Sequence, residues 1–351
     1  MTMMKAYRLL EWGRPPEFAD ALKPSPGAND VLIRMKAAGL CRSDLDIIDS
    51  DPDSGPYAPN VSAGFTLGHE NAGVVEAVGS NVLDLREGDH VIAHHIHSCG
   101  YCDACLHGTE QSCQIYAAKT VPLTRGVGLD GGLAEFLVVP RHELVPIGSL
   151  DPVEIAPLSD AGVTAYRAVA SVQERLRGGT TALVIGMGGL GAYGVQLLKL
   201  MTGARVFAVD VQPRRLSLAA ELGADEALLS DASAAEQILD LTNGRGADVT
   251  IDFVGTDATL ALAARVSRPQ GRIILVGMEG GTLQVGWGLL ASNCEFTISL
   301  GSTRADLYEI CQLAAQGKLR IDVERFSFDA VEEAYTRLRQ GKLDGRAVVT
   351  F

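Results

Sequence analysis

The chain has 351 residues, 47% of them hydrophobic and 21% charged, which is enough for two domains with buried cores. Its formal net charge of −13 argues against a nucleic-acid partner, which requires a basic surface, and against an anionic membrane. Residues 1–10 contain charges and no long apolar run, so no signal peptide is expected. The seven cysteines are an odd number, and a reducing cytoplasm suits them better than a secretory route.

The first part of the chain is predicted to be rich in β-strands. Short runs of β-branched residues alternate there with Gly and Pro. The predicted strands span residues 30–36, 73–78, 90–93 and 134–139. Two long segments between them, 49–64 and 114–133, are predicted to be irregular.

Four cysteines follow the predicted strand at 90–93 with the spacing C-x2-C-x2-C-x7-C. They are Cys99, Cys102, Cys105 and Cys113. Four thiolates on one loop suit a tetrahedral Zn²⁺ site, and a site closed by four protein ligands holds a loop rather than catalysing a reaction. An iron–sulfur cluster is the alternative, because ferredoxin-type runs also begin C-x2-C-x2-C. Those runs close with C-x3-C-P, whereas the last cysteine here comes later and no proline follows it, which favours zinc.

From about residue 156 the pattern changes to alternating strands and helices. Continuous apolar runs at 181–185, 205–209, 248–254 and 271–276 are typical of buried parallel strands. Helical spacing predicts helices at 190–201 and 213–222. The fold predicted for this part is a doubly wound α/β domain. Two more helices, at 305–316 and 329–340, and a last strand at 347–351 are predicted to follow.

A glycine-rich loop joins the first strand and helix of this α/β part. It has the pattern G-x-G-x-x-G, formed by Gly186, Gly188, Gly189, Leu190 and Gly191. Glycines in that position allow a tight turn, close approach of a pyrophosphate and close helix packing, and the helix N-terminus supplies free N–H groups. The alternative is a glycine-rich turn without a ligand.

Asp210 closes the second predicted strand of the α/β part. A carboxylate there can accept hydrogen bonds from both ribose hydroxyls and repels a 2′-phosphate, which favours NAD over NADP. Arg214 and Arg215 follow closely, and an arginine in that place can instead contact a phosphate.

Three separated segments suggest a second metal site. Cys41 ends one predicted β segment, His69 opens another, and Asp160 stands at the junction with the α/β part. A thiolate, an imidazole and a carboxylate would give three protein ligands and one open position, which is the pattern of catalytic zinc. Spacing does not show that these side chains meet, and a lone histidine is more often structural.

With these motifs the chain resembles a zinc-dependent medium-chain alcohol dehydrogenase of the bacterial secondary-alcohol type, along nearly its whole length. The matching pieces are Cys41-Arg42-Ser43-Asp44, the pattern G-H-E-x2-G-x5-G at 68–79, the four cysteines, residues 158–162, and the glycine loop with Asp210. The resemblance implies a GroES-like catalytic domain at 1–157 and 302–351 and a Rossmann NAD-binding domain at 158–301.

The resemblance also assigns roles around a catalytic zinc. Cys41, His69 and Asp160 are implied as its ligands, with Glu70 beside them as an occasional ligand. Asp44 resembles the carboxylate that orients the zinc-bound imidazole.

Other residues resemble positions that serve the proton and the cofactor. Ser43 resembles a hydroxyl that relays the substrate proton toward the cofactor ribose. Arg42 and Arg346 resemble arginines that bind the cofactor pyrophosphate. The positions that resemble the lining of the cofactor site are Thr164, Phe253, Val254, Val276, Gly277, Leu300 and Gly301. Leu300 is also expected to bound the substrate pocket, together with Trp287.

Asp46 departs from the family, several members of which carry a histidine there that ends the proton relay. The hypothesis is that Asp46 serves as an outer base or makes the mouth of the pocket polar, and the alternative is a solvated carboxylate. His94, His95 and His97 have the composition of a metal-binding tract. They are nevertheless expected to lie at the exit of a strand beside the cysteine lobe.

The function implied by the resemblance is reversible oxidation of alcohols, secondary ones first, to ketones or aldehydes with hydride transfer to NAD. The resemblance also implies two zinc ions per chain, one catalytic and one structural, a small-molecule alcohol or ketone as partner, and a homotetramer or a dimer. Two other functions remain open. They are a polyol or amino-alcohol dehydrogenase of the same family, and a catalytically inactive dinucleotide-binding protein.

Overall fold

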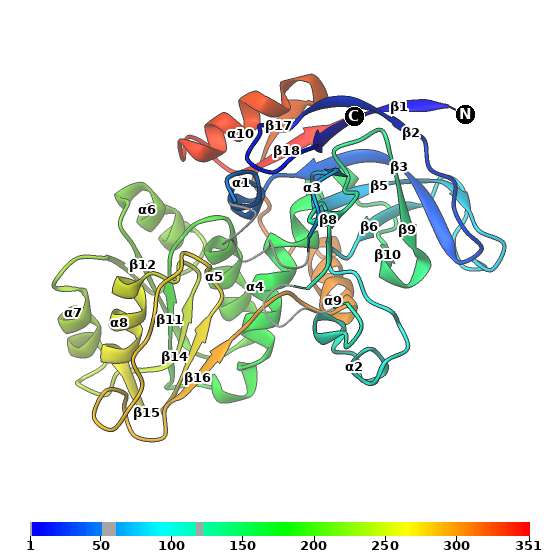
Figure 1. Ribbon diagram of the computed structural model, residues 1–351. Helices are drawn as coiled ribbons and strands as arrows, with labels where there is room; N and C mark the ends of the chain where they lie inside the picture. The colour runs from blue at the N-terminus through cyan, green and yellow to red at the C-terminus, as the bar shows by residue number, and fades with distance from the viewer. Residues whose placement is uncertain (1, 51–60, 117–121) are drawn as a thin grey trace. The chain divides into compact units, whose positions relative to one another are not determined.

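The structure is a computed structural model that describes residues 2–50, 61–116 and 122–351 (Figure 1). Its internal contacts divide the chain into two units, one formed by Met1–Val163 with Gly301–Phe351 and the other by Thr164–Leu300. Both ends of the chain therefore belong to the first unit. Residues 51–60 of the predicted irregular segment at 49–64, and 117–121 of that at 114–133, lie outside the described part.

The first unit is built mainly of β-strands. They are β1 (Met3–Leu9), β2 (Glu17–Leu22), β3 (Asp30–Gly39), β4 (Phe65–Thr66), β5 (Glu70–Val78), β6 (His90–Ala93), β7 (Thr124–Arg125), β8 (Gly128–Leu129), β9 (Phe136–Pro140), β10 (Leu144–Pro146), β17 (Val323–Ser327) and β18 (Arg346–Thr350). Its helices are α1 (Arg42–Ile48), α2 (Asp103–Leu106), α3 (Pro152–Ile155), α9 (Arg304–Ala315) and α10 (Val331–Arg339). Single 3-10 turns include η2 (Arg141–Glu143) and η3 (Ala156–Ser159).

The largest sheet of this unit has the order β10-β6-β5-β3-β18-β17, and β9 also pairs with β3. Strand β18 is antiparallel to β3, with Val349 opposite Ala38, so the end of the chain completes a sheet begun near its start. Alternate side chains of β3, from Val31 to Met35, join one apolar core. A second core contains side chains of α1 and α10 together with the ends of β3 and β18.

Helix α1 corrects one expectation from the sequence. Cys41 to Asp44 was expected to end a β segment, but β3 ends at Gly39 and Cys41 is the N-cap of α1. The backbone N–H of Cys41 donates a hydrogen bond of 2.9 Å to Oδ2 of Asp44. A carboxylate three residues into a helix satisfies a free N–H at its start, so Asp44 fixes the place of Cys41.

The second unit is a parallel α/β fold. Its elements are β11 (Thr181–Ile185), α5 (Gly189–Met201), β12 (Arg205–Asp210), α6 (Pro213–Glu221), β13 (Glu226–Leu229), α7 (Ala234–Leu241), β14 (Ala247–Asp252), α8 (Asp257–Val266), β15 (Ser267–Leu275) and β16 (Glu295–Ile298). α4 (Ala161–Ala170) begins in the first unit and ends in the second.

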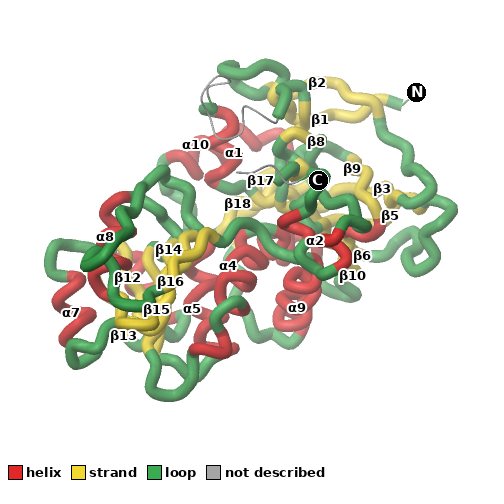
Figure 2. Tube along the Cα trace, turned by 60° about the horizontal axis from the view of Figure 1, so that its bottom comes forward, coloured by secondary structure: helices red, strands yellow, loops and turns green. Residues whose placement is uncertain are grey.

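The six strands of this unit are parallel in the order β13-β12-β11-β14-β15-β16. Figure 2 shows the labelled strands β12 to β16 gathered in one region, in yellow. Buried side chains of α7 and α8 pack with Leu183, Phe207 and Ile273 in one apolar core. This strand order is that of a doubly wound dinucleotide-binding fold, so the predicted fold class is confirmed. Every strand and helix predicted from the sequence overlaps an observed element. Among the described residues, no helix is long and apolar enough to cross a membrane.

Candidate metal and nucleotide sites

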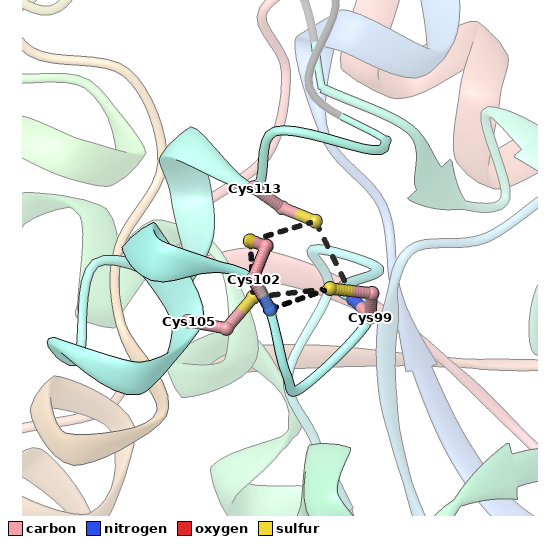
Figure 3. A group of neighbouring side chains, drawn as sticks. All are labelled: Cys99, Cys102, Cys105 and Cys113. Carbon is pink, nitrogen blue, oxygen red and sulfur yellow. Dashed lines mark hydrogen bonds between the residues drawn. The ribbon is translucent and has the colours of Figure 1, made fainter.

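The four predicted cysteine ligands converge on one point of the first unit (Figure 3). Cys102 precedes the single turn α2, and the sulfur atoms of all four lie within 4.8 Å of one another. Sγ of Cys102 is 3.5 Å from that of Cys105 and 3.9 Å from that of Cys113. Sγ of Cys99 is 3.8 Å from that of Cys105. Zinc bonded to four sulfurs at about 2.3 Å needs sulfur–sulfur edges of about 3.8 Å, so this cage fits a zinc ion.

Backbone N–H groups of the same loop also favour thiolates. The N–H groups of Tyr101 and Cys102 donate to Sγ of Cys99, and that of Gln114 donates to Sγ of Cys102. Backbone hydrogen bonds from Cys105 and Gln114 lower the pKa of Cys102 to about 6. Burial instead raises the pKa of Cys105 to about 12, because a buried thiolate is disfavoured unless a cation stabilises it.

A second group of potential ligands also lies in the first unit. It consists of Cys41, His69, Glu70 and Asp160, whose ligand atoms all lie within 4.8 Å of one another. Strand pairing builds it, because Gly39 at the end of β3 is opposite Glu70 at the start of β5. Asp160 follows directly after η3. The sequence suggested these residues from separated segments, and the structure brings all four together.

Glycines hold the segment that carries His69. Gly68 has φ of 91°, in the left-handed region that favours glycine. A Cβ at Gly131 would lie 2.2 Å from the carbonyl oxygen of Gly68, and one at Gly126 would lie 2.5 Å from it. Only glycines allow these backbones to approach so closely. Gly126 and Gly131 were not recognised in the sequence, because their need for glycine arises from a distant segment.

Asp44 connects two of the potential ligands. Its Oδ1 is 2.9 Å from Nδ1 of His69, without the alignment of a straight hydrogen bond, and its Oδ2 accepts from the backbone of Cys41. Nε2 of His69 points the other way and is 3.3 Å from Oδ2 of Asp160. Burial disfavours protonation of His69, but Asp44 and Asp160 outweigh burial and hold the pKa of His69 well above its usual value.

Glu70 is fully buried and forms an ion pair with Arg346 of β18, which is largely buried. Nε of Arg346 donates to Oε2 of Glu70 at 3.1 Å, and its Nη2 donates to Oε1. Burial raises the pKa of Glu70 although Arg346 acts against this. Arg346, expected from the resemblance to bind a pyrophosphate, is thus engaged by the carboxylate next to His69. The sequence did not indicate this pair, because 276 positions separate its members.

The charge of this cluster favours a cation. Cys41, Asp44, Glu70 and Asp160 bring a thiol and three carboxylates into a largely buried space, where Arg346 supplies one positive charge. Buried charges are costly unless they are paired or bind a metal. A thiolate, an imidazole and carboxylates are a donor set that suits zinc, so these residues fit a zinc ion.

Two histidines that follow β6 lie close to this cluster. Nδ1 of His95 is 2.6 Å from the carbonyl oxygen of Ser159, and its Nε2 is 3.7 Å from Oδ1 of Asp160. Nε2 of His94 is 3.0 Å from the hydroxyl of Ser302. Burial lowers the pKa of both histidines, that of His94 to about 3. Both lie at the exit of the strand, as expected.

The remaining predicted residues near Cys41 lie on α1. Oγ of Ser43 is 3.4 Å from Nε2 of His69, so this hydroxyl borders the cluster. Arg42 and Asp46 are exposed on the same helix.

The glycine loop of the second unit has the form that a dinucleotide needs. Gly186 has φ of 88°, and a Cβ at Gly191 would lie 1.8 Å from the carbonyl oxygen of Gly186. A Cβ at Gly188 would meet nothing within 4 Å, which leaves its backbone accessible at the start of α5. The first glycine therefore makes the turn, and the third allows the helix to pack on the strand.

Asp210 lies beside this loop at the end of β12. Its Oδ2 accepts from the N–H of Met187 at 2.7 Å, and its Oδ1 accepts from that of Gln212 at 2.9 Å. Nη1 of Arg215 is 3.5 Å from Oδ2 of Asp210. The carboxylate is thus held in a fixed orientation, with an arginine within reach of it.

Several predicted lining residues surround the same loop. A Cβ at Gly186 would lie 2.4 Å from Cγ2 of Val254. A Cβ at Gly277 would lie 2.2 Å from the carbonyl oxygen of Val254. Phe253 packs against Gly194 of α5, and Val276 is buried. Thr164 and Leu300 stand at the two ends of the second unit, and Gly301 begins the returning segment of the first. Trp287 is fully exposed on its loop.

Comparisons with known proteins identify the family of the chain. The family described as alcohol dehydrogenase GroES-like domain matches residues 27–149, and that described as zinc-binding dehydrogenase matches residues 189–316. A NAD-dependent alcohol dehydrogenase from Sulfurisphaera tokodaii is 34% identical over 358 residues, which cover 99% of each chain. The chain belongs to the zinc-type alcohol dehydrogenase family. The family predicted from the sequence is therefore confirmed.

Two other members of the family show its range. The crystal structure of the alcohol dehydrogenase from Aeropyrum pernix has a TM-score of 0.90 and 36% identity, covering 99% of this dehydrogenase and 100% of that chain. A D-arabinose 1-dehydrogenase (NADP(+)) from Saccharolobus solfataricus is 32% identical over 357 residues, covering 100% of this chain and 98% of the relative. The family thus includes relatives that are named for different substrates and different nicotinamide cofactors.

Proposed function

We propose that the chain catalyses the reversible, NAD-linked oxidation of alcohols, secondary alcohols first, to ketones or aldehydes. The observation that carries the proposal is the buried cluster of Cys41, His69, Glu70 and Asp160. In this proposal Cys41, His69 and Asp160 hold a catalytic zinc. Glu70, which is paired with Arg346, is an occasional ligand. Zinc bound there supplies Lewis acidity that lowers the pKa of the substrate hydroxyl.

The protein residues then manage the proton and the orientation of the ligands. Asp44 holds His69 with Nε2 free to act as a ligand, because it faces Nδ1 on the other side of the ring. Ser43, whose hydroxyl borders His69, receives the hydroxyl proton of the substrate. Asp46 on the exposed side of α1 is proposed as an outer base. Unchanged pH–rate profile and substrate preference in Asp46→Asn would refute that role.

Hydride is proposed to pass to NAD held by the second unit. The glycine loop 186–191 and the fixed carboxylate of Asp210 support this assignment. Domains are assigned accordingly, catalytic at 1–157 and 302–351 and nucleotide-binding at 158–301. Each assay should also be run with NADP, because Arg215 lies beside Asp210 and one relative is named for NADP(+).

A second zinc per chain is assigned to Cys99, Cys102, Cys105 and Cys113. Four thiolates leave no open position for a substrate, so this ion would hold the lobe rather than take part in the reaction. The sulfur–sulfur distances support zinc at this place.

We also propose a homotetramer, with a dimer as the alternative, in the cytoplasm. β16 is an edge strand of the six-stranded sheet, and its Ile298 is 69% exposed. The segment before it exposes Val285 and Trp287 as well. An edge strand with exposed apolar side chains is a surface that another copy of the chain can cover.

The test is an NAD-linked oxidation screen across 2-butanol, cyclohexanol, sorbitol and threonine, with metal analysis of the same sample. About two zincs per chain are expected from one closed and one open site. Cys41→Ser should abolish activity, whereas the matched control Cys311→Ser, buried in α9, should retain it. Full activity in a metal-free sample would refute the proposal. Zinc-loaded protein without any turnover would favour the inactive dinucleotide-binding alternative.

The polyol or amino-alcohol dehydrogenase remains a second candidate. The observation that favours it is the D-arabinose 1-dehydrogenase among the relatives, at an identity close to that of the NAD-dependent alcohol dehydrogenases. Higher kcat/KM for sorbitol or threonine than for both 2-butanol and 2,3-butanediol would decide for this candidate.

A further inference from the structure

His95 is a buried polar group next to the proposed catalytic cluster that no step of the proposed reaction uses. Only 6% of the residue is exposed. It is not one of the four residues whose ligand atoms all lie within 4.8 Å of one another. Its ring therefore lies beside the metal-ligand set and is not itself a member of it.

The hydrogen bonds of His95 fix which nitrogen carries the proton. The carbonyl oxygen of Ser159 can only accept, so Nδ1 of His95, 2.6 Å away, is the donor. In the neutral ring Nε2 then has a free lone pair and can only accept. The backbone of His95 is held too, because its carbonyl oxygen accepts from the N–H of Arg125 at 3.1 Å.

Nε2 of His95 faces a second acceptor. It is 3.7 Å from Oδ1 of Asp160, which is beyond hydrogen-bond distance, and two acceptors cannot bond each other. A group that donates a hydrogen would satisfy Nε2 at this place. A small-molecule substrate with a second hydroxyl brings such a donor, whereas a simple alcohol has only the hydroxyl that reacts.

We propose that His95 determines specificity by accepting a hydrogen bond from a second hydroxyl of the substrate, on the carbon next to the one oxidised. The substrate class is then vicinal diols and, in the reverse direction, α-hydroxyketones. This inference rests on the proposed function, since Asp160 marks where the reacting oxygen binds. The adjacent carbon is part of the proposal, because Nε2 of His95 is 3.7 Å from Oδ1 of Asp160, one of the proposed zinc ligands, and so lies near the reacting end of the substrate.

The reaction balances with the cofactor already proposed. The C–H hydrogen of one carbinol leaves as hydride to NAD⁺, and its O–H proton is released through Ser43. The second hydroxyl is neither oxidised nor lost, so His95 holds the same group in the diol and in the hydroxyketone. His95 is thus a binding residue in both directions, and proton transfer does not involve it.

The test compares 2,3-butanediol with 2-butanol, which differ by one hydroxyl. His95→Asn places an amide where Nδ1 stands, which keeps the bond to Ser159, and removes Nε2. The matched control is His90→Asn, because Nδ1 of His90 also bonds a backbone carbonyl, that of Leu150, at 3.0 Å. We expect the ratio of kcat/KM for diol over monoalcohol to fall about tenfold in His95→Asn, as for loss of one buried hydrogen bond. The control should keep the wild-type ratio.

A second readout does not depend on turnover. In zinc-loaded protein the diol should raise Tm more than 2-butanol does, and His95→Asn should lose this difference while keeping its zinc content. Equal losses for both alcohols, loss of zinc in the variant, or a wild type without preference for the diol would overturn the inference while leaving the proposed function intact. If no alcohol is oxidised, the proposed function itself fails, and this inference with it.

Discussion

Replacing Asp44 by Asn tests the proposed catalytic site without touching a proposed ligand. Asp44 is fully buried, with Oδ1 2.9 Å from Nδ1 of His69 and Oδ2 2.9 Å from the backbone nitrogen of Cys41. The carboxylate thus faces two N–H donors with two acceptor oxygens. An amide keeps only one acceptor, so its NH2 must face either Cys41 or His69.

Each orientation of the amide harms the site. An NH2 facing Nδ1 of His69 favours the tautomer with the proton on Nε2, which cannot then be a metal ligand. An NH2 facing Cys41 leaves a buried backbone N–H without its acceptor at the start of α1. Loss of a carboxylate behind a metal-ligating histidine lowers metal affinity by about 10- to 100-fold, or about 1.4 to 2.7 kcal/mol.

The assay is stepwise removal of zinc by a chromophoric chelator, followed by thermal unfolding of the same samples. Two release steps are expected from wild-type protein, and only one should move to lower chelator concentration in Asp44→Asn. Asp49→Asn is the matched control, because Asp49 follows the same helix but is exposed and pairs with Arg339. Unchanged release in Asp44→Asn, with an intact fold, would refute the assignment of this cluster as a metal site.

Three further predictions concern other parts of the chain. Burial lowers the pKa of His94 from 6.5 to about 3, so below pH 6.5 the unfolded chain binds a proton that the folded chain does not. As the pH decreases below 6.5, the free energy of unfolding should therefore decrease by up to about 1.4 kcal/mol per pH unit from this group. Urea unfolding between pH 7 and 5 should show a weaker dependence of this free energy on pH in His94→Gln. Cys102→Ala should lose one zinc per chain and lower Tm before it changes kcat, and a stable protein with only a turnover defect would contradict the structural role of the lobe. Ile298→Lys on the edge strand β16 should shift sedimentation toward smaller species, and an unchanged assembly would show that another surface is used.

The α/β unit was the most predictable part of the fold. Its central strands β11 and β12 are continuous apolar runs that are almost entirely buried and so appear directly in the sequence. The edge strands β13 and β16 are only partly buried and were not predicted. β1, β17 and helix α1 were not predicted. α1 is only seven residues long, and β17 owes its place to pairing with β18 at the end of the chain. Short elements of this kind depend on distant partners that no local pattern reveals.

The candidate sites also differ in how far the sequence could predict them. The four cysteines and the glycine loop are each contained in one short segment, so spacing alone indicated what they could bind. Cys41, His69 and Asp160 come from three segments, and the resemblance to a family was needed to join them. The pairing of Glu70 with Arg346, and the orientation of His95 by Ser159, depend on the register of the sheet and could not be predicted.

The two metal sites should therefore respond differently when the metal is removed. The cysteine lobe is held by one turn of helix and by hydrogen bonds from its own loop, so little besides the ion keeps its sulfurs together. In the other cluster Asp44 holds Cys41 and His69, and Arg346 holds Glu70, all on the largest sheet or at its ends. We expect that framework to survive removal of the ion, which is what a site with an exchangeable position requires. In the proposed function, the conspicuous cysteine motif stabilises the fold, and the dispersed cluster of Cys41, His69 and Asp160 carries the chemistry.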